Sequence, residues 1–432
     1  FQLSKFKKIK QLIERTNDLE HQNYYQVWSI NVGFFKLVNI FDKYSYFKKF
    51  NIILKVIRDQ ILAKKKKYKL QELNLKENHS YKNIFITWYN YSEYPYYYDK
   101  YFDYKLTKKN TLNFLINHNQ SAEFKHNNSI MYKISNSTEL NIFDNILIVV
   151  NLIFFLLTKK FRKYDKYEID ISNKILQIVN KYNIRKIIMP YEAQLFQKNI
   201  INLVRKHNEK IKIIGYLHSS IPALPVEFIK TSNNVDVIYV HGNNHKKILL
   251  QCGWKNKDVK SIPSLRYNRS SKNYFSNKIF LPMVFTEKNL SSYTENLEYI
   301  FNNVGLINLE TIIIKNHPLM NDSILHKNFI NFFEKYKNNN IKKKKTKIKK
   351  EKKNISIFIS TTAAIIEALE HGIIVIHICV DENLEAYNPY FWKDIKIIRL
   401  KKNVFLYKLK KMNQYIDYNN KNKKKITDKI FN

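Results

Sequence analysis

Two short polar groups that follow apolar runs have the residue types of an anion-binding site. In the first, the apolar run Ile355–Ile359 leads into Ser360, Thr361 and Thr362, and an apolar helix is expected over Ala363–Glu370. Hydroxyl groups at the start of a helix lie beside backbone N–H groups that have no partner within the helix. Such a place suits a phosphate, because the N–H groups and the helix dipole both favour negative charge.

The second group ends another apolar run. Within Glu310–Met320, the β-branched residues are followed by Lys315, His317 and Pro318. Lysine and protonated histidine both donate hydrogen bonds to anions. If both runs are strands of one parallel sheet, the two groups lie at its carboxyl edge, where open α/β sheets bind nucleotides. The sequence therefore predicts a nucleotide site at these two strand ends.

A third group combines a carboxylate with an imidazole. Strands expected over Asn183–Pro190 and Lys210–Tyr216 would end just before Glu192 and His218. At adjacent strand ends, these two groups are suited to act as a general base and as a partner for an oxyanion or a phosphate. The alternative is that Glu192 only caps the following helix and that His218 is an ordinary loop residue. Residue types alone leave both interpretations open.

The elements that would position these groups follow an α/β pattern. Short β-branched or aromatic runs at Asn83–Trp88, Leu112–Ile116 and Val235–Val240 alternate with helical stretches. This alternation is typical of parallel sheets with crossover helices. The polar, proline-containing segment Ser261–Tyr267 separates two such patterns and marks the expected hinge. A strand expected over Lys278–Phe285 would begin the second pattern.

The composition fits folded domains of ordinary size. The chain has 432 residues, of which 44% are apolar, enough for two cores. Its two cysteines, Cys252 and Cys379, belong to no Cys-x-x-Cys or Cys/His motif. Disulfides and cysteine-based zinc sites are therefore not expected, and a reducing, cytoplasmic location fits. The chain contains no Gly-x-Gly-x-x-Gly, P-loop or His-Glu-x-x-His motif, and no sequence feature calls for a metal.

The formal charge of +39 would attract anionic partners. Most of it is lysine in scattered runs such as Ile341–Lys353, whereas a nucleic-acid site gathers arginine and aromatic residues on one face. We therefore expect no specific nucleic acid. The apolar run Ile146–Leu157 is too short to span a bilayer. It is either a buried core helix or a helix at a membrane interface, and the inner face of the cytoplasmic membrane is the surface expected for such a contact.

Together, these motifs resemble those of bacterial GT-B glycosyltransferases that build surface carbohydrates such as capsule and O-antigen. Lys315–Pro318 (KNHP) resembles the His-Pro motif of bacterial sialyltransferases, and Ser360–Leu369 (STTAAIIEAL) resembles their Ser/Thr motif. Pro190–Gln197 (PYEAQLFQ) and Gly215–Pro222 (GYLHSSIP) are similar to acceptor-domain signatures of surface-polysaccharide enzymes. Ser264–Tyr267 (SLRY) is similar to their interdomain segment.

This resemblance implies an α/β fold of the GT-B type, with two facing Rossmann-like domains. We expect a helical, basic extension over residues 1–80 and an acceptor-side domain over residues 81–262. A nucleotide-sugar-binding domain would cover residues 263–410, and a charged tail, frayed from Lys421 onward, would cover residues 411–432.

The resemblance also implies roles for individual residues. Glu192 would be the catalytic base, with His218 beside it. The residues expected to bind the donor nucleotide are Lys315, His317, Pro318, Ser360, Thr361, Thr362, Arg266 and, at the ribose, Glu367. Such an enzyme has a nucleotide-sugar co-substrate, for which a CMP-linked sugar is one candidate, and uses no cofactor or metal. It transfers the sugar with inversion to a saccharide or lipid-linked acceptor.

The chain departs from the family at Gln197, where the acceptor motif often ends in a second carboxylate. This departure keeps a catalytically inactive GT-B scaffold open as an alternative. A CDP-polyol phosphotransferase of similar fold is another alternative, because it would use similar motifs. A basic nucleic-acid-binding protein is the least favoured.

Overall fold

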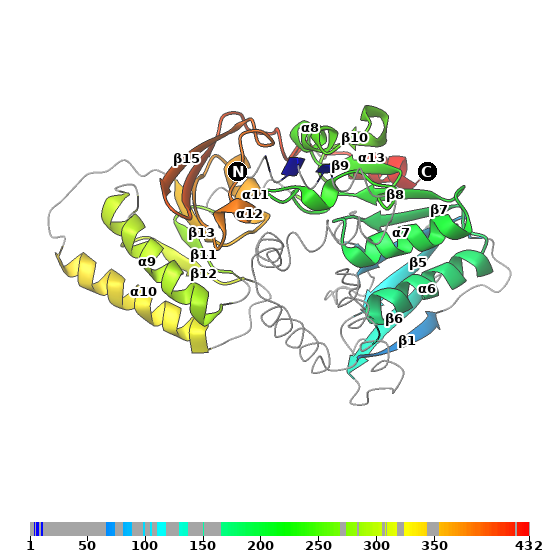
Figure 1. The fold of residues 1–432 in the computed structure, drawn as a ribbon, viewed down its shortest axis with the longest axis horizontal. Coiled ribbons are helices and arrows are strands. Elements are labelled where there is room, and N and C mark those ends of the chain that lie inside the picture. The colour runs from blue at the N-terminus through cyan, green and yellow to red at the C-terminus, as the bar shows by residue number, and fades with distance from the viewer. Residues whose placement is uncertain are drawn as a thin grey trace.

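The computed structural model describes most of the chain from residue 166 onward and selected segments before it. The described residues are 4, 6–7, 10–11, 66–73, 81–88, 98–99, 104–105, 110–117, 129–136, 150, 166–267, 274–282, 285–304, 307, 309–317, 324–343, 354–419 and 421–431. They form two sheets in separate lobes (Figure 1).

The N-terminal sheet has eight strands in the order β1-β6-β5-β2-β7-β8-β9-β10. Their bounds are β1 Lys66–Leu73, β2 Asn83–Trp88, β5 Thr111–Asn117, β6 Ser129–Asn136, β7 Lys186–Pro190, β8 Lys212–Tyr216, β9 Val237–Val240 and β10 Val259–Ser261. All neighbouring pairs are parallel except β1 with β6. The order from β6 to β9 is that of a doubly wound Rossmann sheet, and it reverses direction between β2 and β7.

Helices cover this sheet, and a small hairpin lies outside it. The helices are α6 Lys166–Lys181, α7 Leu195–His207 and α8 Asn243–Gln251, and the hairpin pairs β3 Tyr98–Asp99 with β4 Tyr104–Lys105. Helices α6 and α7 pack side by side on the N-terminal lobe (Figure 1). The buried residues of the central strands are mostly apolar, such as Ile84, Phe114, Leu115 and Ile187, as expected for strands covered on both sides.

The C-terminal sheet has six strands in the order β12-β11-β13-β14-β16-β15. The bounds are β11 Lys278–Phe280, β12 Ile313–Lys315, β13 Ile355–Ile359, β14 Ile374–Ile378, β15 Ile395–Lys401 and β16 Val404–Leu409, with helices α9 Glu287–Asn303, α10 Ile324–Lys343, α11 Ala364–Glu370 and α12 Glu382–Glu385. Strands β12, β11, β13 and β14 are parallel, and β16 and β15 extend the sheet antiparallel. Strand order reverses between β11 and β13, so the turn after β13 lies at a switch point.

These two sheets confirm the predicted α/β class with two Rossmann-like domains, the arrangement of the GT-B type. The predicted strand Asn83–Trp88 has the observed bounds of β2, and Ile355–Ile359 has those of β13. The strand predicted over Lys278–Phe285 is shorter, because β11 ends at Phe280. Pro282 follows closely, and proline cannot donate to a ladder.

The predicted helical extension over residues 1–80 is wrong at its end. Residues Lys66–Leu73 form strand β1, which pairs antiparallel with β6 and closes that edge of the N-terminal sheet. The lysines of this segment favoured a basic helix over a strand in the prediction, but lysine is also common in edge strands. Most of the other residues of this segment lie outside the described part of the chain.

The predicted frayed tail is also wrong. Helix α13, Lys423–Phe431, lies on the N-terminal lobe although it ends the chain (Figure 1). Ile430 and Phe431 are buried there, and the Phe431 ring packs edge-on against Phe85 of β2 at 5.3 Å between centroids. Because the helix is rich in lysine, its small apolar face, which includes Ile430 and Phe431 and packs against the lobe, was not recognised in the sequence.

The segment between β16 and α13 returns the chain from the second lobe to the first. Its backbone N–H groups at residues 413–416 donate to the Glu370 carboxylate at the end of α11. On the other side it passes so close to Gly242 that a Cβ there would lie 2.6 Å from the carbonyl oxygens of Gln414 and Tyr415. The Trp392 indole N–H donates to Ala223 O at 2.9 Å, a further bond between the lobes.

No helix among the described residues is both long and apolar enough to cross a membrane. The apolar run Ile146–Leu157 lies, apart from Val150, outside the described residues, so its expected membrane contact stays a prediction.

Candidate functional site

The best-defined polar group lies at the carboxyl end of the N-terminal sheet, beside its switch point. Glu192 follows β7 and His218 follows β8, and the imidazole Nε2 lies 2.9 Å from Glu192 Oε1. The Ser219 hydroxyl donates to the same oxygen at 2.5 Å. The other oxygen, Oε2, accepts from the side-chain amide of Gln194, an exposed residue, at 2.7 Å. One carboxylate oxygen is thus anchored inside the lobe, and the other faces a displaceable side chain.

The surroundings of Glu192 favour its ionised form. Burial alone would raise its pKa, but hydrogen bonds and charge from His218, the Ser219 hydroxyl and the positive charge of Arg266 outweigh burial and lower the pKa to about 2. Glu192 is therefore a carboxylate over the whole physiological range. It does more than cap α7, because its Oε1 bonds to His218 and Ser219 of the β8 loop.

An aromatic wall flanks the imidazole. The His218 ring lies 5.9 Å from the ring of Trp88, the last residue of β2, and Trp88 packs edge-on against Phe196 of α7 at 5.7 Å. The ends of β2, β7 and β8 therefore meet, as the switch-point geometry requires.

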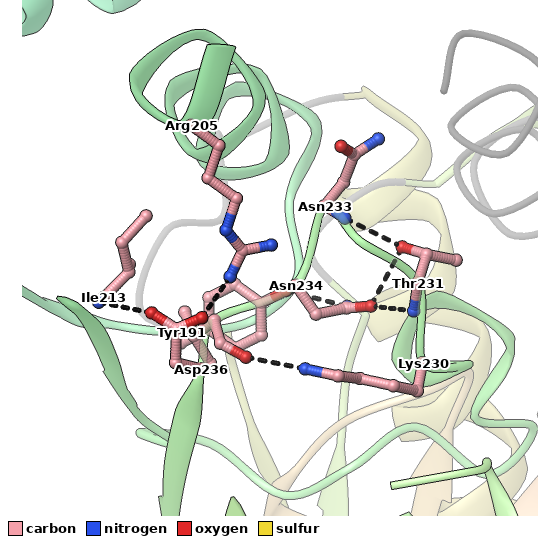
Figure 2. Close-up of polar contacts among 9 residues, drawn as sticks. Tyr191, Arg205, Ile213, Lys230, Thr231, Asn233, Asn234 and Asp236 are labelled. Carbon is pink, nitrogen blue, oxygen red and sulfur yellow. Dashed lines mark hydrogen bonds and ion pairs between the residues drawn. The ribbon is translucent and has the colours of Figure 1, made fainter. Parts of the chain in front are cut away.

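A buried network under the loop fixes its start (Figure 2). The Tyr191 hydroxyl accepts from the Asn234 amide at 3.0 Å, and Asn234 in turn accepts from the Thr231 N–H. Asp236 pairs with Arg205 of α7, so α7 and the turn before β9 are joined beside Tyr191. Because Tyr191 directly precedes Glu192, this network fixes the position at which the catalytic candidate leaves β7.

Arg266 connects the two lobes electrostatically. Its guanidinium donates to the His218 carbonyl at 2.5 Å and contributes to the low pKa of Glu192. The same positive charge acts on Glu367 of α11 in the other lobe, whose pKa burial nevertheless raises to about 7. The acceptor-side carboxylate and the expected ribose-binding carboxylate thus share one cation.

The turn after β13 is held from below by side chains that the sequence did not single out. Ser360 adopts φ +65°, a left-handed conformation that is uncommon for a residue with a side chain. Its carbonyl accepts from His377 Nε2 at 3.1 Å. Its side chain lies near those of Tyr293 and Glu385, and burial raises the pKa of Glu385 to about 7. Thr361 is exposed, and the Thr362 hydroxyl accepts from the N–H of Ala364 at 3.3 Å.

Helix α11 contributes less than the sequence predicted. It starts at Ala364 and has seven residues, so its dipole is short. An anion at this turn would be held by the hydroxyls of Ser360, Thr361 and Thr362 more than by the helix.

His317 and Lys315 lie at the same sheet edge but are not next to Ser360. Strand β12 is the edge strand, and β11 lies between it and β13. The Lys315 ammonium lies 5.7 Å from the centre of the Tyr274 ring, and partial burial lowers the pKa of His317. Pro318 lies outside the described residues. No contact between His317 and Ser360 appears among the described residues, and a ligand that touches both would have to extend past the end of β11.

Within the described part of the chain, one group of side chains has the composition of a metal site. Donor atoms of His377, Cys379 and Glu385 all lie within 4.8 Å of one another beneath Ser360. They also bond within the protein: His377 to Ser360 O, Cys379 Sγ to His377 Nδ1 at 3.5 Å, and Glu385 to the Val380 N–H at 2.9 Å. In this state they support the turn.

Three contributors were not singled out from the sequence. Gln194 lies within the motif Pro190–Gln197 but was assigned no role, and Glu385 and Tyr293 stand in no motif. Ser219 could have been found from its place beside His218.

Comparisons with known proteins show limited likeness. No protein-family model and no curated protein matches the chain. Among solved structures, a UDP-N-acetylglucosamine 2-epimerase from Rickettsia bellii is 12% identical at a TM-score of 0.34, with 68% of this chain and 77% of that chain covered. The lipopolysaccharide outer core galactosyltransferase WaaB is 10% identical at 0.31, covering 68% and 80%. A glycosyltransferase from Rickettsia africae ESF-5 is 13% identical at 0.29, covering 61% and 71%. We therefore base the function on the geometry of the site.

Proposed function

We propose that this protein is a glycosyltransferase that moves a sugar from a nucleotide-sugar donor to a saccharide or lipid-linked acceptor in surface-carbohydrate assembly. The observation that carries the proposal is the placement of Glu192: one oxygen is anchored by His218 and Ser219, and among the described residues the other accepts a hydrogen bond from the exposed Gln194. An acceptor hydroxyl can replace the Gln194 amide at that oxygen without disturbing the anchor.

In the proposed reaction, the acceptor oxygen attacks the anomeric carbon as its proton passes to Glu192. The bond from that carbon to the donor phosphate breaks, and the phosphate leaves with the electron pair. A base and a separate stabiliser of the leaving charge are the two requirements of this step. Attack opposite the leaving phosphate inverts the anomeric centre.

The low resting pKa of Glu192 makes it a weak base while its present bonds last. Loss of the Gln194 bond and exclusion of water by the bound acceptor both raise the proton affinity of the carboxylate. The Nε2 of His218 lies 2.9 Å from the anchored oxygen Oε1 and stabilises the negative charge of the Glu192 carboxylate until the proton is transferred.

The donor would bind across the C-terminal sheet edge. The Ser360, Thr361 and Thr362 hydroxyls and the cationic groups of Lys315 and His317 would hold its phosphates, and Glu367 would accept from the ribose hydroxyls. Arg266 supports this placement, because it lies within electrostatic reach of both Glu367 and Glu192. The proposal assigns no metal to transfer, so turnover should survive a chelator. Loss of turnover in EDTA would contradict that part and direct attention to His377, Cys379 and Glu385.

Product analysis tests the proposal against the phosphotransferase alternative. Incubation with CMP-, UDP- and GDP-sugars and with CDP-polyols, in the presence of oligosaccharide acceptors, should yield a new glycosidic bond and a released nucleotide. A product that contains a phosphodiester, with CMP released from a CDP-polyol, would establish the alternative.

The inactive-scaffold alternative rested on Gln197. Its side chain points into the loop of residues 190–194, where it bonds to backbone groups, and not toward the Glu192 carboxylate. The amide at position 197 therefore removes no base from this site.

A further inference from the structure

Gln197 lies in the third position of α7 and is 1% exposed. Its side-chain oxygen accepts from two backbone N–H groups, those of Glu192 and Gln194, each at 3.1 Å. Its side-chain nitrogen donates to the Pro190 carbonyl at 2.6 Å. One side chain thus closes a ring of three bonds around the loop that carries Glu192.

The backbone inside that ring is strained. Ala193 has φ +57°, a left-handed conformation that is unfavourable for a residue with a Cβ. This turn sends the chain from β7 into α7 and aims the preceding carboxylate at the β8 loop. Neighbouring bonds must compensate for the strain, and those of Gln197 span it on both sides.

The chemistry of the ring requires an amide. A carboxylate at this position could accept from both N–H groups but could not donate to the Pro190 carbonyl, and it would place its charge against that carbonyl's oxygen. A protonated carboxyl would regain the donor. The sequence pattern suggested that position 197 had lost an acid. The structure instead shows that the oxygen and the nitrogen of the Gln197 amide both form hydrogen bonds with the loop backbone.

We propose that Gln197 is a positioning residue that holds Glu192 against His218 and Ser219. This inference rests on the proposed function only for its catalytic meaning, because the geometry it describes exists without substrate. A purely structural Gln197 would stabilise the fold without affecting how strongly Glu192 bonds to the β8 loop.

The test measures the melting temperature lost on Glu192→Gln in several backgrounds, over a pH series from 8 to 4.5. In the wild type this loss should be small but constant throughout the series, because the Glu192 carboxylate stays ionised above pH 4.5. In Gln197→Met, which keeps the volume but removes donor and acceptor, it should fall below half the wild-type loss. In Gln197→Glu it should be smaller than in the wild type at pH 8 and approach the wild-type value as the introduced carboxyl becomes protonated. The other titratable groups beside the loop, His218, Arg266 and Lys198, are the same in every background, so they cannot produce that difference.

Two further variants keep the test specific. Gln251→Met removes a similar amide bond, from Gln251 to the Tyr390 carbonyl, outside the loop, and should leave the Glu192→Gln loss at its wild-type value. Ala193→Gly removes the penalty of the left-handed conformation. In the Gln197→Met background it should bring the melting-temperature loss caused by Glu192→Gln part of the way back to its wild-type value.

An equal Glu192→Gln loss in all backgrounds would overturn the inference, even if every Gln197 variant melted earlier than the wild type. The proposed function fails separately, through absence of transfer in the product analysis, which leaves this comparison of melting temperatures intact.

Discussion

The two strand-end groups differ in how completely the protein itself satisfies them. At the N-terminal sheet, Glu192 is surrounded by His218, Ser219 and Gln194, and its loop is closed by Gln197. At the C-terminal sheet, His317 and the Ser360 turn lie two strands apart, and Thr361 is exposed. A base must be aimed before substrate arrives, whereas groups that bind phosphates can be brought into use by the ligand itself. This difference is the basis on which we propose that the first lobe carries the chemistry and the second binds the donor.

The largest effect is expected from the base. Glu192→Gln keeps the size of the side chain and removes its proton affinity, so kcat should fall about 10²–10⁴-fold while donor affinity is unchanged. Steady-state kinetics with titration of the donor nucleotide checks this. Glu209→Gln, on an exposed loop, is the matched control, and a variant at position 192 with normal kcat would contradict the assignment.

Arg266 tests whether the two lobes act together. Arg266→Met should lower turnover about tenfold to a hundredfold, because it removes a charge-assisted bond to the β8 loop and the cation shared by both carboxylates. Donor affinity should weaken as well, since Glu367 loses its partner. Arg399→Met, which removes an exposed pair with Glu382, should change neither quantity. If only one of the two quantities responds, Arg266 belongs to one lobe alone.

The donor side should show smaller, graded losses. Ser360→Ala should weaken nucleotide binding about tenfold, the cost of roughly one hydrogen bond. His317→Ala should weaken it less, because His317 follows the edge strand while Ser360 lies at the switch point. Isothermal titration of both variants measures the order, with Ser291→Ala on α9 as control. The reverse order would move the phosphates to the β12 end.

The smallest effect is on stability. The folded pKa of Glu192 is lowered from 4.5 to about 2, so its charge stabilises the fold fully above pH 4.5 and loses that contribution as the pH falls through about 2. Because the side chain is partly exposed, we expect about 2 kcal/mol from Glu192 at pH 7. Denaturant titrations of wild type and Glu192→Gln should show a gap at pH 7 that narrows only below pH 4.5. A gap that widens toward acid pH would contradict the assigned pKa.

The strand pattern was readable from the sequence, and with it the meeting of Glu192 and His218. Both residues follow buried β-branched runs that occur one after the other along the chain, so parallel pairing brings them to one edge. The order of the second sheet was not readable. His317 and Ser360 follow runs of the same kind, yet β11, three residues long, separates them.

Lysine content hid two elements. Strand β1 and helix α13 are both lysine-rich, and the buried residues of α13 are Thr427, Ile430 and Phe431, too few to predict the helix from its apolar pattern. The role of Gln197 was also hidden. Whether a glutamine faces substrate or its own backbone depends on the turn at Ala193, and a left-handed alanine leaves no mark in the sequence.

The most direct test of the division between the lobes is a thermal-shift panel of CMP, CDP, UDP, GDP and their sugars against wild type, Glu192→Gln and Ser360→Ala. A nucleotide at a hundred times its dissociation constant adds about 2.7 kcal/mol to the unfolding free energy. We predict that one nucleotide class stabilises wild type and Glu192→Gln alike and stabilises Ser360→Ala much less. Absence of any shift, or a shift lost on Glu192→Gln but kept in Ser360→Ala, would contradict the account.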